Sequence, residues 1–167
     1  MTRVVVWITE GTWQGCVDAA ARLALADAEF TLLHVSDGGP AEALHGAFGG
    51  LLGRGSGHDP GVAVEGLRGP AARELVEAAE ERLGRGAAHV LRTGDVEREV
   101  VAACADAELL VCARDGAHDR LGPRSLGRWT RFVVDHAPCA VLLVWPDEVP
   151  GVESLPAKPA EPPKPPR

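Results

Sequence analysis

The sequence predicts a doubly wound α/β fold, in which helices lie on both faces of a parallel sheet. Short apolar runs rich in Val and Leu alternate along the chain with amphipathic segments of helical length. The runs are continuously apolar, which is typical of strands buried on both faces. This alternation implies right-handed crossovers and a ligand crevice at the carboxyl ends of the strands, near the point where the strand order reverses.

Length and composition fit one soluble globular domain. With 167 residues, of which 46% are hydrophobic and 25% charged, the chain can build one sizeable core. No apolar run approaches the roughly 20 residues that span a bilayer, and the amino terminus shows no signal-peptide pattern. We therefore expect a cytoplasmic protein with no membrane association.

Charge and cysteine usage argue against two classes of function. A net charge of −7 disfavours nucleic-acid binding, because that role requires a basic face against many phosphates. The four cysteines form no CxxC pair and have no histidine at metal-binding spacing. We expect small buried thiols and no bound metal.

The first strand–helix–strand unit occupies the first 35 residues. A β-branched run at residues 4–8 predicts a buried strand, and residues 9–12 form a polar turn. Near-helical spacing of apolar residues predicts a helix over residues 13–27, and residues 30–35 predict the second strand.

A glycine-rich stretch at residues 38–69 interrupts this regular alternation. We interpret it as a flexible insertion with room for one short helix among residues 43–52. Its GRGSG segment, residues 53–57, resembles a phosphate loop in composition. However, it follows no strand and opens no periodic helix, so a dinucleotide-binding motif is disfavoured.

The middle of the chain predicts two helices and two strands. Pro70 suits the first position of a helix that ends at Leu83 before Gly84. A short strand is expected at residues 88–91. Thr93-Gly94-Asp95 then predicts a turn and an N-cap for a helix with Val96, Val100 and Ala103 facing inward, and residues 109–113 predict the next strand.

The last unit contains the most distinctive loop. Between residues 114 and 131, five arginines oppose only two aspartates, and three glycines are interspersed among them. Glycines that follow a parallel strand and open a helix let backbone N–H groups face an anion. We therefore expect a phosphate group at this loop, although the glycines alone also fit a tight connection.

A helix and a final strand follow this loop. Ser125 is the expected helix cap, and Leu126, Trp129, Val133 and Ala137 lie on one face. Pro138 ends the helix, and residues 139–145 predict the last strand. On that face, Trp129 is more typical of the core than of a base-stacking platform. Hydrogen-bonded structural roles are similarly expected for His34 and His136.

A proline-rich tail follows the predicted domain. Eight of the 13 prolines lie between residues 146 and 167. We therefore divide the chain into a domain at residues 1–146 and an extended, disordered tail at residues 147–167. PxxP spacings in the tail could serve a protein partner, but a solvated tail is the simpler interpretation.

Four stretches resemble the universal stress protein family. They are Leu32-Leu33-His34-Val35, Thr93-Gly94-Asp95, residues 110–116 and the closing segment Asp135-His136-Ala137-Pro138-Cys139-Ala140-Val141-Leu142. The resemblance covers roughly residues 3–146 and omits the insertion and the tail. It implies a Rossmann-like five-stranded parallel sheet of order 3-2-1-4-5 and a homodimer through the last strand.

The resemblance also implies a nucleotide site. Family members that bind ATP carry G-x2-G-x9-G followed by Ser or Thr after the fourth strand. Here Ala113 takes the first glycine position, Gly116 and Gly127 the others with ten intervening residues, and Arg128 the hydroxyl position. Thr130 matches a further hydroxyl position. The usual Asp-Gly-Ser turn after the first strand becomes Glu10-Gly11-Thr12.

We therefore expect a regulatory stress-response protein that binds ATP, ADP, AMP or a small phosphate anion at a degenerate loop. The expected binding residues are Thr9, Glu10, Gly11, Val35, Ala113, Arg114, Gly116, Gly127, Arg128, Trp129 and Thr130. A dimeric interaction protein of the same fold that binds no nucleotide is the alternative, and a nucleotide hydrolase ranks third. The sequence contains no GxSxG motif, Ser-His-Asp arrangement or Walker lysine that would favour an enzyme.

Overall fold

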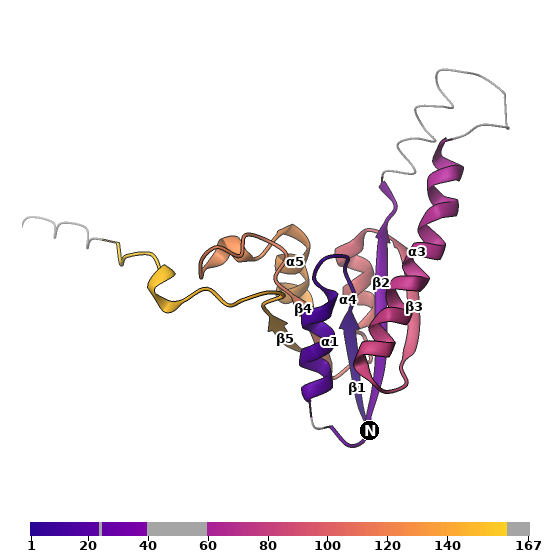
Figure 1. The fold of residues 1–167 in the computed structure, drawn as a ribbon, viewed down its shortest axis with the longest axis horizontal. Helices are drawn as coiled ribbons and strands as arrows, with labels where there is room; N and C mark the ends of the chain where they lie inside the picture. Colours follow the sequence, from indigo (N-terminus) through magenta and orange to yellow (C-terminus); the bar gives the residue numbers. More distant parts are fainter. Residues whose placement is uncertain (24, 40–59, 160–167) are drawn as a thin grey trace, which may run out of the picture.

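Five parallel strands form one twisted sheet at the centre of the molecule (Figure 1). The computed structural model describes residues 1–23, 25–39 and 60–159, without the side chains of residues 60–67. The strands pair in the order β3-β2-β1-β4-β5, which confirms the expected topology. They are β1 (Thr2–Trp7), β2 (Ala28–Asp37), β3 (Ala88–Gly94), β4 (Leu109–Ala113) and β5 (Ala140–Val144).

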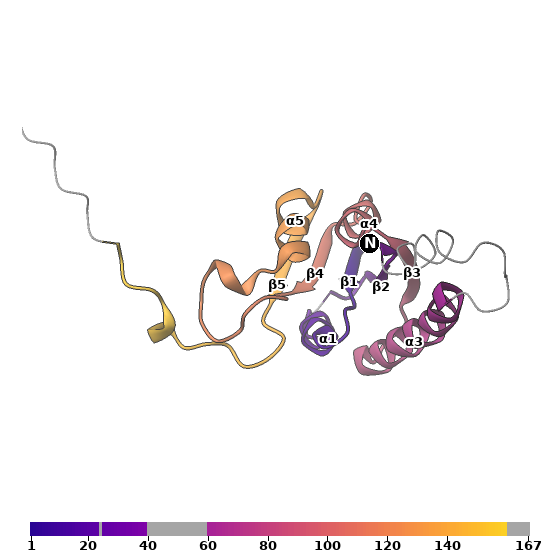
Figure 2. The same cartoon turned by 90° about the horizontal axis from the view of Figure 1, so that it is seen from above.

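Helices cover both faces of the sheet (Figure 2). The helices α1 (Trp13–Arg22) and α3 (Pro60–Leu83) lie on one face, and α4 (Val96–Ala103) and α5 (Arg128–His136) lie on the other. Successive β1 residues point to opposite faces, so Val4 and Val6 pack with α1 and α3, while Val5 and Trp7 pack with α4. Both clusters are buried, which explains the continuously apolar strand sequence.

The helix expected to begin at Pro70 begins ten residues earlier, at Pro60. Pro70 lies inside α3 and is exposed. Arg68 Nη1, in the preceding turn, donates to the carbonyl oxygen of Asp37 at 2.7 Å. This contact holds the amino-terminal part of the helix against the end of β2, so tertiary structure overrides the local signal of the proline. The last ten residues of the predicted insertion are thus helical, whereas residues 43–52 and 53–57 lie outside the described residues.

Several other boundaries differ from the sequence prediction, including those of the first two strands and the last strand. The first helix ends at Arg22, and Thr93 and Gly94 extend β3, so Asp95 alone precedes α4. Ser125 does not cap α5, because it lies in a separate 3₁₀ turn, Pro123–Ser125, and Gly127 is the N-cap residue. The buried Ser125 hydroxyl instead donates to the Gly122 carbonyl at 2.7 Å.

The start of the tail returns toward the β4–α5 loop. The backbone N–H of Leu121 donates to Ser154 Oγ at 3.0 Å, within a short 3₁₀ turn at Val152–Ser154. His118 Nδ1 lies 3.4 Å from Asp147 Oδ2. No helix in the described part of the chain combines the length and apolar character needed to cross a bilayer.

Candidate functional site

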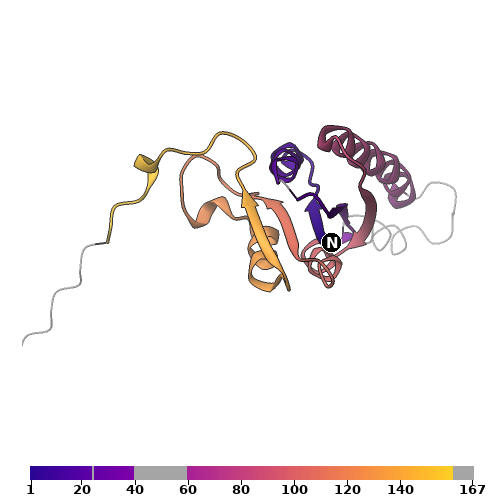
Figure 3. The same cartoon turned by 90° about the horizontal axis from the view of Figure 1, so that it is seen from below.

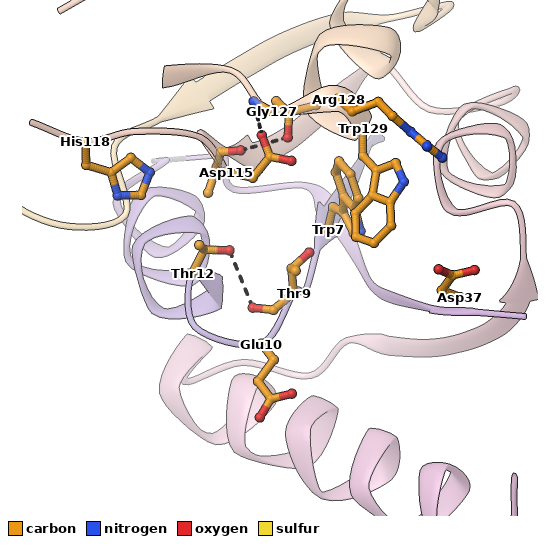
Figure 4. Close-up of a pocket in the computed structure, with 12 residues that line it drawn as sticks. Trp7, Thr9, Glu10, Thr12, Asp37, Asp115, His118, Gly127, Arg128 and Trp129 are labelled. Atoms are coloured by element: carbon orange, nitrogen blue, oxygen red, sulfur yellow. Dashed lines mark hydrogen bonds between the residues drawn. The ribbon is translucent and has the colours of Figure 1, made fainter. Parts of the chain in front are cut away.

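A cavity of about 560 Å³ lies at the carboxyl ends of β1 and β4 (Figure 4). These neighbouring strands flank the point where the strand order reverses, the usual crevice of a doubly wound sheet. The cavity is lined by Trp7, Thr9, Glu10, Thr12, Asp37, Ala113, Asp115, His118, Gly127, Arg128, Trp129 and Thr130. Its volume is in the range of pockets that hold small organic ligands.

Seven of the eleven expected binding residues line this cavity. They are Thr9, Glu10, Ala113, Gly127, Arg128, Trp129 and Thr130. Val35 lines a neighbouring cavity of about 350 Å³, which shares Thr9, Glu10 and Asp37 with the first. Gly11, Arg114 and Gly116 line neither cavity.

Gly11 shapes the turn that carries Thr9 and Glu10 into the cavity. Its φ of 84° lies in the left-handed region that favours glycine. The backbone N–H of Thr12 donates to the Thr9 carbonyl at 3.1 Å and closes the turn. Gly11 thus positions two lining residues without touching the cavity itself.

Arg114 contacts the end of β5, away from the cavity lining. Its guanidinium carbon lies 4.6 Å from the centroid of the Trp145 ring, and its Nη1 donates to Ser125 Oγ. Its Nε is buried without a hydrogen-bond partner among the described residues. These contacts stabilise the β4–α5 loop against β5, so the geometry assigns this arginine a structural role.

Gly116 allows a close approach between two backbone segments. Its N–H donates to the Ser125 carbonyl at 2.9 Å. A Cβ atom at this position would lie 2.2 Å from the carbonyl oxygen of Arg124, a distance that real atoms do not reach. The glycine is therefore required to close the loop on itself.

The five arginines of the loop do not converge on the cavity. Arg128 alone among them lines it, and its side chain is 82% exposed and lies 3.7 Å from Glu97. Arg131 instead donates to the carbonyl oxygens of Pro123 and Leu126, at 2.7 and 3.1 Å. Arg120 pairs with Asp119 at 3.3 Å. The positive excess counted in the sequence is thus spread over the surface of the loop.

Carboxylates outnumber arginines in the cavity lining. Glu10, Asp37 and Asp115 face one arginine there. Asp37 ends β2 and Asp115 follows β4 by two residues, so both lie at carboxyl ends of strands, a position that sequence reasoning could have flagged. Trp7, Thr12 and His118 also line the cavity without having been expected.

Asp115 caps the start of α5. The backbone N–H of Gly127 donates to Asp115 Oδ1 at 2.7 Å, as Figure 4 shows. A Cβ atom on Gly127 would lie 2.7 to 2.8 Å from the three carboxyl atoms of Asp115. The missing side chain at Gly127 therefore makes room for this carboxylate.

The hydroxyl of Thr130 and the ring of Trp129 also serve the fold. Thr130 is buried, and its Oγ1 donates to the carbonyl oxygen of Ala113 at 3.2 Å, which joins α5 to β4. Trp129 packs against the cluster that contains Trp7 while one part of it lines the cavity. Trp129 therefore packs against the core, as expected, and also lines the cavity, while base stacking on its ring stays a prediction.

His34 and His136 each contact a backbone carbonyl. His34 Nδ1 lies 2.8 Å from the Ile8 carbonyl oxygen, and its Nε2 lies 3.4 Å from Ser36 Oγ. His136 Nδ1 lies 2.8 Å from the Phe132 carbonyl oxygen. These contacts confirm the hydrogen-bonded structural roles expected for the two side chains.

The cysteines are free thiols, and three of them are buried. Burial raises the pKa of Cys104 to about 12 and that of Cys112 to about 12. Such thiols remain protonated at neutral pH and make poor nucleophiles. Among the described residues there is no group of three or more His, Cys, Asp or Glu side chains that could hold a metal ion.

Comparison with known proteins identifies relatives of this fold. The model of the universal stress protein family matches residues 2–144. No curated protein matches the sequence significantly. Several solved structures do match, and those described below share less than 25% identity with this chain, a level that shows the fold alone.

Three of these structures illustrate the likeness. A hypothetical protein, MJ0577, superposes with a TM-score of 0.66 at 16% identity over 86% of this chain and 95% of its own. Universal stress protein UspA from Lactobacillus plantarum superposes with a TM-score of 0.56 at 21% identity, over 86% of this chain and 97% of its own. A universal stress protein in complex with cAMP superposes with a TM-score of 0.54 at 18% identity, over 87% of this chain and 98% of its own.

Proposed function

This chain belongs to the universal stress protein family, and we propose that it is a stress-response regulatory protein that binds an adenine nucleotide with few phosphates. The observation that carries the proposal is the cavity of about 560 Å³ at the strand crossover, next to the start of α5. A solved structure of similar fold is a universal stress protein in complex with cAMP. The cavity volume suits a ligand of that size.

The side chains of the cavity suit a nucleoside with one phosphate better than a triphosphate. Glu10 and Asp37 are acceptors of the kind that bind ribose hydroxyl groups. Arg128 lines the cavity and is exposed, and its contact to Glu97 is long at 3.7 Å, so its guanidinium is available to one phosphate group. With three carboxylates in the lining, each further phosphate adds repulsion.

The proposed role is regulatory and does not require catalysis. The hydroxyl of Thr130 is hydrogen-bonded within the fold, and Ser125 is buried and hydrogen-bonded. We place the protein in the cytoplasm and propose that it acts as a homodimer through residues 139–145. The tail is the segment available to a protein partner.

Calorimetry with AMP, ADP, ATP and sulfate tests the binding proposal. We expect the wild-type protein to bind AMP or ADP at least as tightly as ATP, because Arg128 serves one phosphate and the carboxylates oppose the rest. Arg128→Ser should weaken AMP binding by about tenfold, the usual value of a well-aligned charged contact. Arg124→Ser is the matched control, since this exposed arginine belongs to the same loop but does not line the cavity.

The second candidate function is a dimeric interaction protein of the same fold that binds no nucleotide. The acidic lining and the carboxylate on the Gly127 amide favour it. Thermal shift separates the two, because a ligand at a hundred times its Kd stabilises the fold by about 2.7 kcal/mol. If the wild type binds none of the nucleotides while Arg128→Ser gains ATP affinity, Arg128 blocks the site and this second function stands.

A further inference from the structure

We propose that the carboxylate of Asp115 determines which nucleotides the cavity accepts. It accepts the hydrogen bond of the Gly127 N–H, the backbone donor that a further phosphate would need. The inference rests on the proposed function, because it concerns the selectivity of the same cavity. It goes beyond that function by assigning the selectivity to one side chain. The ligand class it names is a nucleoside carrying at most one phosphate.

The position of Asp115, an exposed residue of the cavity lining, is defined by one direct hydrogen bond. Its Oδ1 accepts the Gly127 N–H at 2.7 Å, a short distance typical of a hydrogen bond to a charged acceptor. Both residues line the cavity, together with Arg128 on the next position of the chain. In Figure 4 the carboxylate lies between the loop and the start of α5, on the cavity side of Gly127.

The packing of Gly127 shows that the carboxylate fills this position. The three carboxyl atoms of Asp115 lie only 2.7 to 2.8 Å from the point where a Cβ atom of residue 127 would stand, so the carboxylate packs directly against Gly127. A phosphate oxygen that approached the same N–H would meet a carboxylate at hydrogen-bond distance and like charge. Two anions at such a distance repel each other, so either the phosphate or the Asp115 carboxylate must move away from this N–H.

The remaining charges of the cavity do not offset this repulsion. Among the residues that the structure describes, Arg128 is the only arginine in the lining, and it lies close to Glu97. Arg131 and Arg114 bind carbonyl oxygens and Ser125, which keeps them away from the cavity. One phosphate can therefore be neutralised by Arg128, while a second or third would face Asp115 without a cation.

Calorimetry on the full chain tests this selectivity with AMP and ATP. We expect Asp115→Ala to raise ATP affinity by about tenfold or more while AMP affinity changes little. The substitution leaves the Gly127 N–H available to a phosphate and removes one negative charge from the cavity. Asp115→Asn retains an acceptor for Gly127 and removes only the charge, so its effect should fall between those of wild type and alanine. It also serves if the alanine variant is poorly folded.

Asp119→Ala is the matched control. Asp119 belongs to the same loop and pairs with Arg120, but it does not line the cavity. We expect its AMP and ATP affinities to equal those of wild type. The inference is overturned if wild type binds ATP more tightly than AMP, or if both Asp115 variants leave the ratio of the two affinities unchanged.

A measurement that needs no nucleotide keeps this inference separate from the proposed function. The amide resonance of Gly127 is followed by NMR while inorganic phosphate is added. We expect a saturable shift in Asp115→Ala and none in wild type. If AMP and ATP bind to no variant but phosphate shifts Gly127 only in Asp115→Ala, the proposed function fails and the role of Asp115 stands. If phosphate shifts Gly127 equally in both proteins, or in neither, the role of Asp115 is refuted.

Discussion

Gly116 makes the β4–α5 loop possible at the scale of a single residue. Its N–H and the N–H of Ala117 both donate to the opposite side of the loop, to Ser125 and Arg124, at 2.9 Å each. The two backbone segments approach so closely that no side chain fits between them. The glycine expected to contact phosphate therefore shapes the loop that carries the site.

Gly116→Ala is expected to destabilise the fold by about 1 to 3 kcal/mol, the usual cost of forcing a closely packed segment apart. The added methyl group would meet the Arg124 carbonyl oxygen. Urea unfolding followed by circular dichroism measures the change. Gly86→Ala is the control, because a Cβ there meets no atom within 4 Å. Equal stability of the two variants would contradict the close approach.

Glu80 links two elements, the helix α3 and the strand β3. Its Oε1 accepts the Ala87 N–H at 2.9 Å, and its Oε2 lies 2.9 Å from His89 Nε2. The hydrogen bond from the Ala87 N–H and, to a smaller extent, the one to His89 lower the pKa of Glu80 below its ordinary value of 4.5. The carboxylate form is therefore favoured in the folded state.

The pKa of Glu80 predicts a pH dependence of stability. A carboxyl whose pKa is lowered by folding stabilises the fold above its unfolded pKa, and this contribution is lost as pH falls through the folded pKa. We expect Glu80→Gln to be less stable than wild type at pH 7 and equally stable at pH 3. Urea midpoints at the two pH values measure this. Glu81→Gln, at the exposed next position of α3, should follow wild type at both. If the urea midpoints of Glu80→Gln and wild type differed by the same amount at both pH values, the pH dependence assigned to Glu80 would be refuted.

At the scale of the whole molecule, the strand β5 forms one edge of the sheet (Figure 3). Val141, Leu142, Leu143 and Val144 are half-buried, and they pack against both hydrophobic clusters. An apolar edge strand offers unpaired backbone groups to a second chain. We propose that two copies of the protein associate there.

Sedimentation at micromolar concentration tests this dimer. We expect a dimer for wild type and a monomer for Leu142→Lys, because a charge at the edge opposes burial against a second copy. Leu91→Lys is the control on the opposite edge strand, β3, where Leu91 is 41% exposed. Circular dichroism verifies that both variants fold. A wild-type monomer, or a dimer that Leu142→Lys leaves intact, would exclude this interface.

Removal of the tail tests the division into domain and tail. Among the described residues, neither hydrophobic cluster includes one beyond Val144, and the tail meets the β4–α5 loop through polar contacts, the part-buried hydrogen bond from Leu121 to Ser154 and the approach of Asp147 to His118. A chain that ends at Pro146 should therefore melt within about two degrees of the full chain, since a shift of several degrees corresponds to about 1 kcal/mol. A larger loss would show that the tail contributes to the fold.

The sequence by itself determined the fold class and most elements of this protein. A strand buried on both faces must be continuously apolar, and a helix on a sheet must repeat its apolar residues every third or fourth position. Both signals are local, and they identified the five strands and the helices α1, α3, α4 and α5 apart from their ends. The strand order came from the family resemblance, because periodicity does not specify which strands pair.

Tertiary structure alone decided how the site is composed. The five arginines were visible as a positive excess, but their directions depend on partners such as Trp145, Glu97 and the carbonyl of Pro123. The contact between Asp115 and Gly127 joins residues twelve positions apart across a closed loop. Charge can be counted along a chain, whereas the field at a site depends on where each side chain points. That direction is determined by packing between elements, and no local pattern encodes it.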